Sequence, residues 1–469
     1  MMKKIIAILS SLFVIASSVG TDISCSKSTT YKAIFVMSGN QKMEDNSFNQ
    51  SIYEGVSSYI KNILGENKSF KPLYGEAKEG DYDSFSSIYK KIYKDKDIKT
   101  VVLNGYSHNT TGKEDYAKLA DDNKKSTVIV DAEGQGKSTI GIEFRADMSG
   151  FYAGMASIIW SILNNNYSTS KDGKNILTLA TYGGLLEGTQ ASVVNYMEGF
   201  YSAVYWWREA QRRHIKGDSE VFQKILNNFD IPEHKINSWI ENNSTIQRVQ
   251  QSDPTSMNLN TYQSGSFTIG KGVDIIQRFI QNKANVIMPV AGRQTNDLLL
   301  VIKNQYSTSN VKAVGVDFDN SKLYSSYDKY LITSAEKSLD IGTEVAMSHT
   351  DDYFDRDNIQ KNTINLLNKP ENNNILFSLA SDQENLIDIS KKSEWKSWEG
   401  DNVIVSGDIA HGDKMSINDD FYKKLLSVFP IKDVIKASYS YFDESKTKDY
   451  EYLLSESFLT DQAIKIMGK

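Results

Sequence analysis

Short apolar runs alternate with longer amphipathic stretches along most of the chain. Each run is nearly continuous in apolar character and ends in polar or glycine residues, which is typical of buried parallel strands. The runs cover residues 33–37, 100–103, 127–130, 175–180, 285–290 and 311–316. Between them, apolar residues spaced three and four apart predict helices. These helices are expected over residues 49–63, 84–93, 150–163, 190–213, 271–281 and 296–304.

This alternation predicts an α/β fold of doubly wound parallel sheets with right-handed crossovers. The strand–helix units are too many for one ordinary sheet, so two lobes are expected. We place the first lobe at residues 32–145 and about 335–400, and the second at 146–334. A polar stretch over about 208–258 interrupts the second lobe as an insertion. Residues from about 401 to 469 form a carboxyl-terminal extension whose place stays open.

Length and composition fit a globular chain. Its 469 residues are 40% hydrophobic and 24% charged, which excludes a disordered chain and a polytopic membrane protein. The net charge of −6 argues against broad nucleic-acid binding, since proteins of that class need a positive surface. We therefore expect no nucleic-acid partner.

The chain contains few residues that suit metal or cofactor chemistry. One cysteine excludes an intrachain disulfide framework and multi-cysteine metal sites, and the five histidines form no H-E-x-x-H motif. Residues 134–138 resemble part of a phosphate loop but lack its first glycine. The chain also lacks a G-x-S-x-G elbow, so a nucleoside hydrolase is a minor alternative. We expect neither a cofactor nor catalysis.

The amino terminus has the layout of a secretory signal. Lys3 and Lys4 precede an apolar run over residues 5–16, which is too short to span a bilayer. Cys25 follows in a setting that resembles the bacterial lipobox, although Asp22 stands where an aliphatic residue is usual. The alternative is an ordinary secreted protein with a free thiol.

Lipidation at Cys25 would define the mature amino terminus. The sequence then divides into a signal peptide over residues 1–24 and a lipid-anchored tether over residues 25–31. Two acyl chains anchor a protein stably where one is marginal. We therefore expect the mature protein on the outer face of the bacterial plasma membrane, held there by a lipid anchor.

One cluster with binding chemistry follows the first predicted strand. Residues 44–55 place Phe48 and Asn49 where a loop opens a helix, at the ligand-facing end of an α/β sheet. The phenylalanine offers a stacking face for a flat ring, and the amide can pair with donor and acceptor edges. In the alternative, Asp45 or Ser47 caps the helix and Phe48 packs inward.

Three further clusters lie at predicted strand ends. Phe267 stands among small residues in the segment 264–274, ahead of a strand that leads to Gly292. Asp317 ends the strand V-G-V-D, where a carboxylate can accept hydrogen bonds from sugar hydroxyls. Lys337 lies at another strand-to-helix junction.

Together the four clusters resemble the basic membrane protein family of substrate-binding lipoproteins, which includes bacterial purine-nucleoside receptors of ABC transporters. The family's D-x-S-F-N-Q-S-x-x-E-G motif matches residues 45–55, and its G-S-F, D-V-I-x-P-V-A-G and V-G-V-D-x-D segments recur in the same order. The resemblance covers residues 32 to about 350. It implies a type I periplasmic-binding-protein fold, with two lobes, three crossing segments and a ligand cleft between the lobes.

The resemblance assigns site residues by motif position. Phe48 and Phe267 match the two phenylalanines that sandwich the purine, and Asn49 matches the neighbouring amide that contacts the ring edge. Asp317 matches the carboxylate that holds the ribose hydroxyls. Lys337 matches a lysine that reaches the ligand from a crossing segment.

The motif aspartate Asp45, together with Gly292 at the end of the P-V-A-G strand, completes the predicted site. Departures from the family pattern surround it. Family members usually carry an aspartate where this chain has Ser38 and another near His108, and they have no counterpart of Arg293. Two lost carboxylates and one gained arginine make the cleft less negative, so the base preference stays open. In the alternative, Arg293 points to the surface.

The resemblance implies a lipid-anchored receptor that closes on a purine nucleoside and presents it to an ABC permease. A sugar or other small-metabolite receptor of the same fold is the first alternative, because aromatic stacking also serves pyranose rings. The second is a surface interaction or adhesion lipoprotein that has lost transport. The insertion and the long carboxyl-terminal third favour that second alternative.

Overall fold

A computed structural model describes most of the chain beyond residue 31, and Lys32–Lys469 form one unit. The described residues are 32–38, 48–63, 73–77, 81–105, 107–110, 115–186, 191–218, 220–240, 244–251, 262–351, 356–445 and 447–468. The predicted signal peptide, the tether with Cys25, and Asp45 lie outside the described residues.

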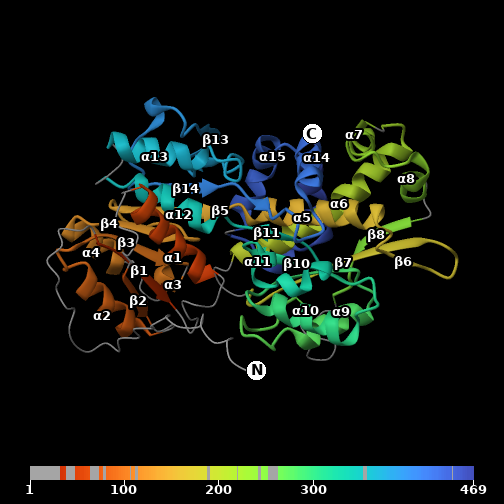
Figure 1. Ribbon diagram of the computed structural model, residues 1–469, viewed down its shortest axis with the longest axis horizontal. Helices are drawn as coiled ribbons and strands as arrows, with labels where there is room; N and C mark the ends of the chain where they lie inside the picture. The colour runs from red at the N-terminus through yellow and green to blue at the C-terminus, as the bar shows by residue number, and fades with distance from the viewer. Residues whose placement is uncertain are drawn as a thin grey trace, which may run out of the picture. The chain divides into compact units, whose positions relative to one another are not determined.

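The first sheet has eight strands and is mainly parallel. Its spatial order is β13 (Asp382–Ile387), β12 (Phe377–Leu379), β14 (Asn402–Val405), β5 (Thr139–Phe144), β4 (Ser126–Val130), β3 (Ile98–Asn104), β1 (Lys32–Ser38) and β2 (Leu73–Ala77). Only the short β12 runs antiparallel to its two neighbours among these pairs. In Figure 1 the blue β14, from late in the chain, lies beside β5 from the first third.

The second sheet has seven strands, of which six follow one path and the seventh, β8, pairs with β7 beside that path. The strands are β15 (Asp408–Ile409), β11 (Leu331–Glu336), β10 (Lys312–Asp317), β9 (Val286–Val290), β7 (Asn175–Gly183), β6 (Ser168–Thr169) and β8 (Ser244–Arg248). The pairs β8–β7, β7–β9, β9–β10 and β10–β11 are parallel, while β6 and β15 run antiparallel at the edges.

The two sheets repeat one topology. The first contains the order β2-β1-β3-β4-β5 and the second the order β8-β7-β9-β10-β11, each of which is a 2-1-3-4-5 doubly wound sheet. The predicted α/β fold with two doubly wound lobes is confirmed. All six strands that the apolar runs predict are present, because each buries nearly every side chain between helices on both faces.

Helices accompany both sheets. Around the first lie α1 (Phe48–Ser58), the π-helix η1 (Tyr59–Ile63), α2 (Tyr82–Ile92), α3 (Ser107–Thr110), α4 (Asp115–Asn123), α12 (Leu339–Ser348), α13 (Asp357–Leu367) and η4 (Lys392–Glu394). Around the second lie α5 (Ala146–Leu163), α6 (Ala191–Ile215), α7 (Glu220–Phe229), α8 (Glu233–Ile240), α9 (Val273–Gln281), α10 (Gln294–Gln305), α11 (Asn320–Leu323) and η3 (Ser325–Tyr330). None of the described helices has the length and apolar character needed to cross a membrane.

The chain crosses between the sheets three times. It passes from β5 into α5 at Arg145, from β11 into α12 after Glu336, and from β14 into β15 through Gly407. The first two crossings contact each other, since Ser149 Oγ donates a hydrogen bond to the Glu336 carbonyl oxygen at 2.6 Å. The third crossing packs against the first at Gly407. A Cβ atom placed on Gly407 would lie 2.2 Å from the Arg145 carbonyl oxygen, so only glycine fits there.

Helices α5 and α6 form the centre of the second lobe. A Cβ atom on Gly150 would lie 2.2 Å from the Tyr196 carbonyl oxygen, and one on Gly154 would lie 2.8 Å from that of Phe200. These glycines therefore permit the two helix backbones to approach closely. Nearly every residue of α5 is buried, because α6, the sheet and the carboxyl-terminal helices cover it on several sides.

Residues beyond 401 are integrated into both lobes. Strand β14 joins the first sheet and β15 the second. The helices α14 (Asp419–Val428), α15 (Ile431–Glu444), α16 (Tyr450–Leu453) and α17 (Glu456–Ile466) follow. Of these, α15 packs on α5, α17 on α6, and α14 on α7 from the segment 208–258. Ring contacts of Trp206 with Phe429 at 4.9 Å and of Phe229 with Phe421 at 4.8 Å hold this layer.

Candidate ligand site at the carboxyl ends of the two sheets

The first wall of the candidate site begins with Phe48, the first residue of α1. Its half-buried ring lies beside Gly105, where a Cβ atom would be 3.8 Å from Phe48 Cε1. Gly105 directly follows β3 and has a φ of +66°, a conformation that glycine adopts without strain. Phe48 therefore lies next to the carboxyl end of β3, the strand that pairs with β1.

Asn49 is fully buried behind Phe48 and begins a chain of polar side chains. Its Oδ1 accepts a hydrogen bond from Asn104 Nδ2 at 2.6 Å, and Asn104 Oδ1 lies 3.1 Å from His108 Nε2. The other ring nitrogen of His108 contacts the Tyr89 hydroxyl. Burial lowers the pKa of His108 to about 3, so its imidazole is neutral at physiological pH.

The second wall is the loop that carries Phe267. A Cβ atom on Gly184, which follows β7, would lie 2.5 Å from Phe267 Cδ1, so the half-buried ring lies at the carboxyl end of β7. Gln294 Nε2 donates to the carbonyl oxygens of Ser266 at 2.6 Å and Thr268 at 3.2 Å. Buried side chains at the start of α10 therefore hold the phenylalanine loop in place.

Gly292 lies between β9 and α10 with a φ of +56°, and a Cβ atom there would meet no atom within 4 Å. Its positive φ, rather than crowding, therefore favours glycine. The neighbouring Arg293 lies near Tyr324, where its positive charge offsets part of the rise in the pKa of that hydroxyl that burial causes. The arginine therefore lies close to the segment between α11 and η3 in its own lobe.

A polar cluster joins the two lobes. Lys337 Nζ lies 2.9 Å from Asp131 Oδ2, with the two side chains only 3% and 11% exposed. Asp131 follows β4 of the first sheet, whereas Lys337 follows β11 of the second. Lys337 Nζ also lies 5.1 Å from the centre of the Tyr196 ring, and the Tyr196 hydroxyl donates to Asp317 Oδ1 at 3.4 Å.

The backbone at both aspartates of this cluster is unusual. Asp131 has a φ of +63° and Asp317 a φ of +71°, a region that residues other than glycine rarely occupy. Aspartate adopts this conformation more readily than most other residues, and Lys124, Asn165, Asp230 and Lys283 share it elsewhere in the described chain. In Asp317 the carbonyl oxygen accepts a hydrogen bond from the Lys337 amide at 3.1 Å.

Burial controls the protonation of the groups around this cluster. It raises the pKa of the Tyr196 hydroxyl well above its ordinary value, and the nearby carboxylates of Asp317 and Asp131 add to the effect. Tyr196 therefore stays a neutral hydrogen-bond donor. Burial, with a contribution from Asp408, raises the pKa of Glu336 to about 8. Its carboxyl group is largely protonated at neutral pH.

The structure brings Asp317 and Lys337 together, and it places Phe48 with Asn49 at one sheet and Phe267 at the other. The site predicted from the sequence does not include Asp131, Asn104 or Tyr196, and it assigns no role to His108. The polar ends of the predicted strands 100–103 and 127–130 could have revealed Asn104 and Asp131, by the same rule that identified Asp317. Tyr196 carries no such signal, because it lies within a buried helix.

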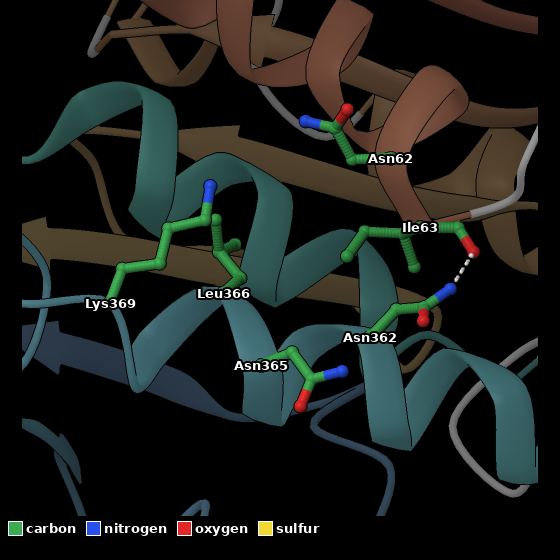
Figure 2. A pocket seen from close by; sticks show the side chains of 6 residues that line it. All are labelled: Asn62, Ile63, Asn362, Asn365, Leu366 and Lys369. Atoms are coloured by element: carbon green, nitrogen blue, oxygen red, sulfur yellow. Dashed lines mark hydrogen bonds between the residues drawn. The ribbon is translucent and has the colours of Figure 1, made fainter.

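A separate cavity of about 160 Å³ lies between η1 and α13. Figure 2 shows its lining, where Asn362 Nδ2 donates to the Ile63 carbonyl oxygen at 3.1 Å. The other lining residues are Asn62, Asn365, Leu366 and Lys369. Because η1 continues α1 away from Phe48, this cavity lies at the opposite end of that helix from the predicted site. Among the described residues, no cluster of three metal-ligating side chains is found.

Comparisons with known proteins place two lipoproteins near this chain, and no family model matches it. The uncharacterized lipoprotein MG040 of Mycoplasma genitalium is 26% identical over 275 residues, covering 53% of this chain and 45% of its own length. Its homolog in Mycoplasma pneumoniae is 20% identical over 386 residues, covering 69% and 58% respectively. The chain thus spans about half the length of these relatives.

Solved structures with a similar course of the chain include ABC transporter solute-binding proteins and LacI-family transcription regulators. One from Aeropyrum pernix covers 68% of this chain and 71% of its own, with 15% identity and a TM-score of 0.46. Another, from Bacillus halodurans with bound myo-inositol, covers 69% and 89%, with 12% identity and a TM-score of 0.39. The fold is assigned from the strand order 2-1-3-4-5 that both sheets share.

Proposed function

We propose that this chain is a substrate-binding protein that holds a purine nucleoside between its two lobes and presents it to an ABC permease. The observation that carries the proposal is the matched placement of two phenylalanines. Phe48 lies at the end of β3 and Phe267 at the end of β7, which are adjacent to the switch points of two sheets with the same strand order. Ligands of doubly wound sheets bind at such points.

Two aromatic faces, one from each lobe, suit a flat ring. Stacking of a base on an aromatic side chain contributes about 1–3 kcal/mol per base. A ligand that contacts Phe48 and Phe267 at once favours the closed arrangement, because only contacts made in that arrangement shift the equilibrium toward it. The proposed family is the basic membrane protein family of nucleoside receptors, whose phenylalanine motifs this chain matches.

The polar cluster supplies the groups for a sugar. Carboxylates at Asp317 and Asp131 are acceptors for ribose hydroxyls, and Lys337 and Tyr196 are donors. In this proposal Lys337 contacts the ligand while it bridges the lobes. We assign no catalytic role to these residues and propose no cofactor.

The relatives from both Mycoplasma species are named lipoproteins. This supports the proposal that Cys25 is the acylated residue and that the binding lobes lie on the outer face of the plasma membrane. Replacing Cys25 by serine is expected to release the protein from the membrane fraction and to abolish labelling by a fatty-acid analogue. A variant that remains labelled and membrane-bound would overturn the anchor at this position.

Ligand binding is tested by thermal shift and calorimetry with a panel of nucleosides. A ligand that binds only the folded protein stabilises it by RT ln(1 + [L]/Kd), so purine nucleosides should raise Tm. Phe48→Ala and Phe267→Ala should each weaken binding roughly 10-fold or more. The matched control is Phe421→Ala, because Phe421 packs on Phe229 in the carboxyl-terminal layer. Unchanged affinity in both site variants would overturn the aromatic sandwich.

A sugar receptor is the second candidate function. The donors and acceptors of the polar cluster favour it, because they bind hydroxyl groups whether or not a base is attached. Free pentoses, hexoses and inositols therefore belong in the same panel. A Tm increase with a free sugar and with no nucleoside would replace the nucleoside proposal by this one.

A further inference from the structure

The buried amide of Asn49 offers a hydrogen-bond donor that no described residue accepts. The residue has no exposed surface, and its Nδ2 has no acceptor among the described residues. Buried amide groups in native proteins are nearly always paired. Asn49 directly follows Phe48, the proposed stacking residue, so an acceptor on the ligand is the partner that this position suggests.

The side chains behind Asn49 determine which end of its amide faces the ligand. Asn104 Nδ2 donates to Asn49 Oδ1, so Asn104 presents its own Oδ1 to His108 Nε2, 3.1 Å away. An oxygen acceptor there requires a proton on Nε2. In a neutral imidazole the other nitrogen is then an acceptor, and the Tyr89 hydroxyl donates to it.

The four side chains thus form a relay whose hydrogen bonds all point one way. Tyr89 donates to His108, His108 to Asn104, and Asn104 to Asn49. The neutral state of His108 preserves this direction, because a doubly protonated ring would donate to the Tyr89 hydroxyl instead of accepting from it. The last member, Asn49, has an amide NH₂ that donates to none of the residues that the structure describes.

We propose that the relay Tyr89–His108–Asn104 holds Asn49 as a hydrogen-bond donor toward the ligand. The site then selects bases that carry an oxo group over bases that carry an amino group. The inference rests on the proposed nucleoside-binding function. Tyr89, His108 and Asn104 are positioning residues in it, since they act through Asn49. An oxo group accepts the Asn49 donor, whereas an amino group opposes it with a second donor.

Inosine and adenosine are the test ligands, because they differ at the exocyclic group of one purine ring. Their Kd values are measured by calorimetry on the full mature chain. We expect inosine to bind on the order of 10-fold tighter or more, the effect of leaving a buried donor unpaired. Asn49→Asp keeps the shape but replaces the free donor by an acceptor, so it should reverse the order of the two ligands.

The relay itself is tested through the ratio of the two Kd values. His108→Leu removes the donor that orients Asn104, so the ratio should fall toward one. His108→Gln retains an N–H donor and should keep much of the preference. Circular dichroism and Tm measurements without ligand establish that each variant is folded. A loss in His108→Leu that is equal for both ligands would show a merely structural role and would overturn the relay.

The outcomes separate this inference from the function on which it rests. Equal wild-type affinities, or tighter binding of adenosine, would overturn the donor assignment while nucleoside binding stands. If neither nucleoside binds, the proposed function fails, and the inference fails with it. Tighter inosine binding that His108→Leu abolishes supports both.

Discussion

The ion pair between Lys337 and Asp131 connects the two lobes, and its removal should lower the free energy of unfolding by an amount that can be worked out from its geometry. Its Nζ–Oδ2 distance is 2.9 Å, and the two side chains are 3% and 11% exposed. Asp131→Asn removes the negative charge at nearly constant volume and leaves the ammonium group buried without it. Breaking one side of a buried pair costs about 3–5 kcal/mol. We expect the lower part of that range, because the asparagine oxygen still accepts a hydrogen bond.

Urea unfolding, followed by tryptophan fluorescence and by circular dichroism, measures this loss in the free energy of unfolding. Lys337→Met and the double variant complete a cycle. The double variant should be more stable than the sum of the single losses predicts, with a coupling energy of about 1–3 kcal/mol. Lys392→Met is the control, since its pair with Asp357 is 71% and 83% exposed and should contribute about 0–1 kcal/mol. A coupling energy of about 0–1 kcal/mol, the range expected for an exposed pair, would refute the buried contact.

Three further substitutions test neighbouring features. Gly184→Val should displace the Phe267 ring, because even a Cβ atom at this position would lie 2.5 Å from the ring. The substitution should therefore weaken ligand binding more than it lowers the stability of the fold. An unchanged affinity, measured by calorimetry, would contradict this expectation. Arg145→Met should lower the free energy of unfolding in urea by about 3–5 kcal/mol, because it leaves the buried carboxylate of Asp147 without its cation. A loss below about 1 kcal/mol would argue against the buried pair. Glu336 has a raised pKa of about 8, so the folded protein loses stability as pH rises from about 4.5 to 8. Glu336→Gln should therefore raise Tm at pH 8.5 and leave it nearly unchanged at pH 4.5, whereas an equal shift at both pH values would contradict the assignment.

The sequence predicted the fold well where the pattern is local. The buried strands β1, β3, β4, β7, β9 and β10 lie within a few residues of the six apolar runs. The strands β2 and β5 were missed. Each contains a glycine and a glutamate, at Gly75 with Glu76 and at Gly141 with Glu143, which interrupt the apolar character on which the prediction depends.

The alternation of strands and helices, and with it the strand ends at which Phe48 and Asp317 lie, can be predicted from periodicity and from residue type within a few positions. The sequence pattern does not predict which strand ends meet. Asp131 and Lys337 are 206 positions apart, and Asn49 and Asn104 are 55 apart. Their pairing depends on the order of strands in two sheets and on three crossings of the chain. The strand β14 joins β5 for the same reason, since backbone hydrogen bonds between distant segments form only when the whole sheet assembles. The polar cluster, the relay behind Asn49 and the place of the described residues beyond 401 therefore depend on the tertiary structure.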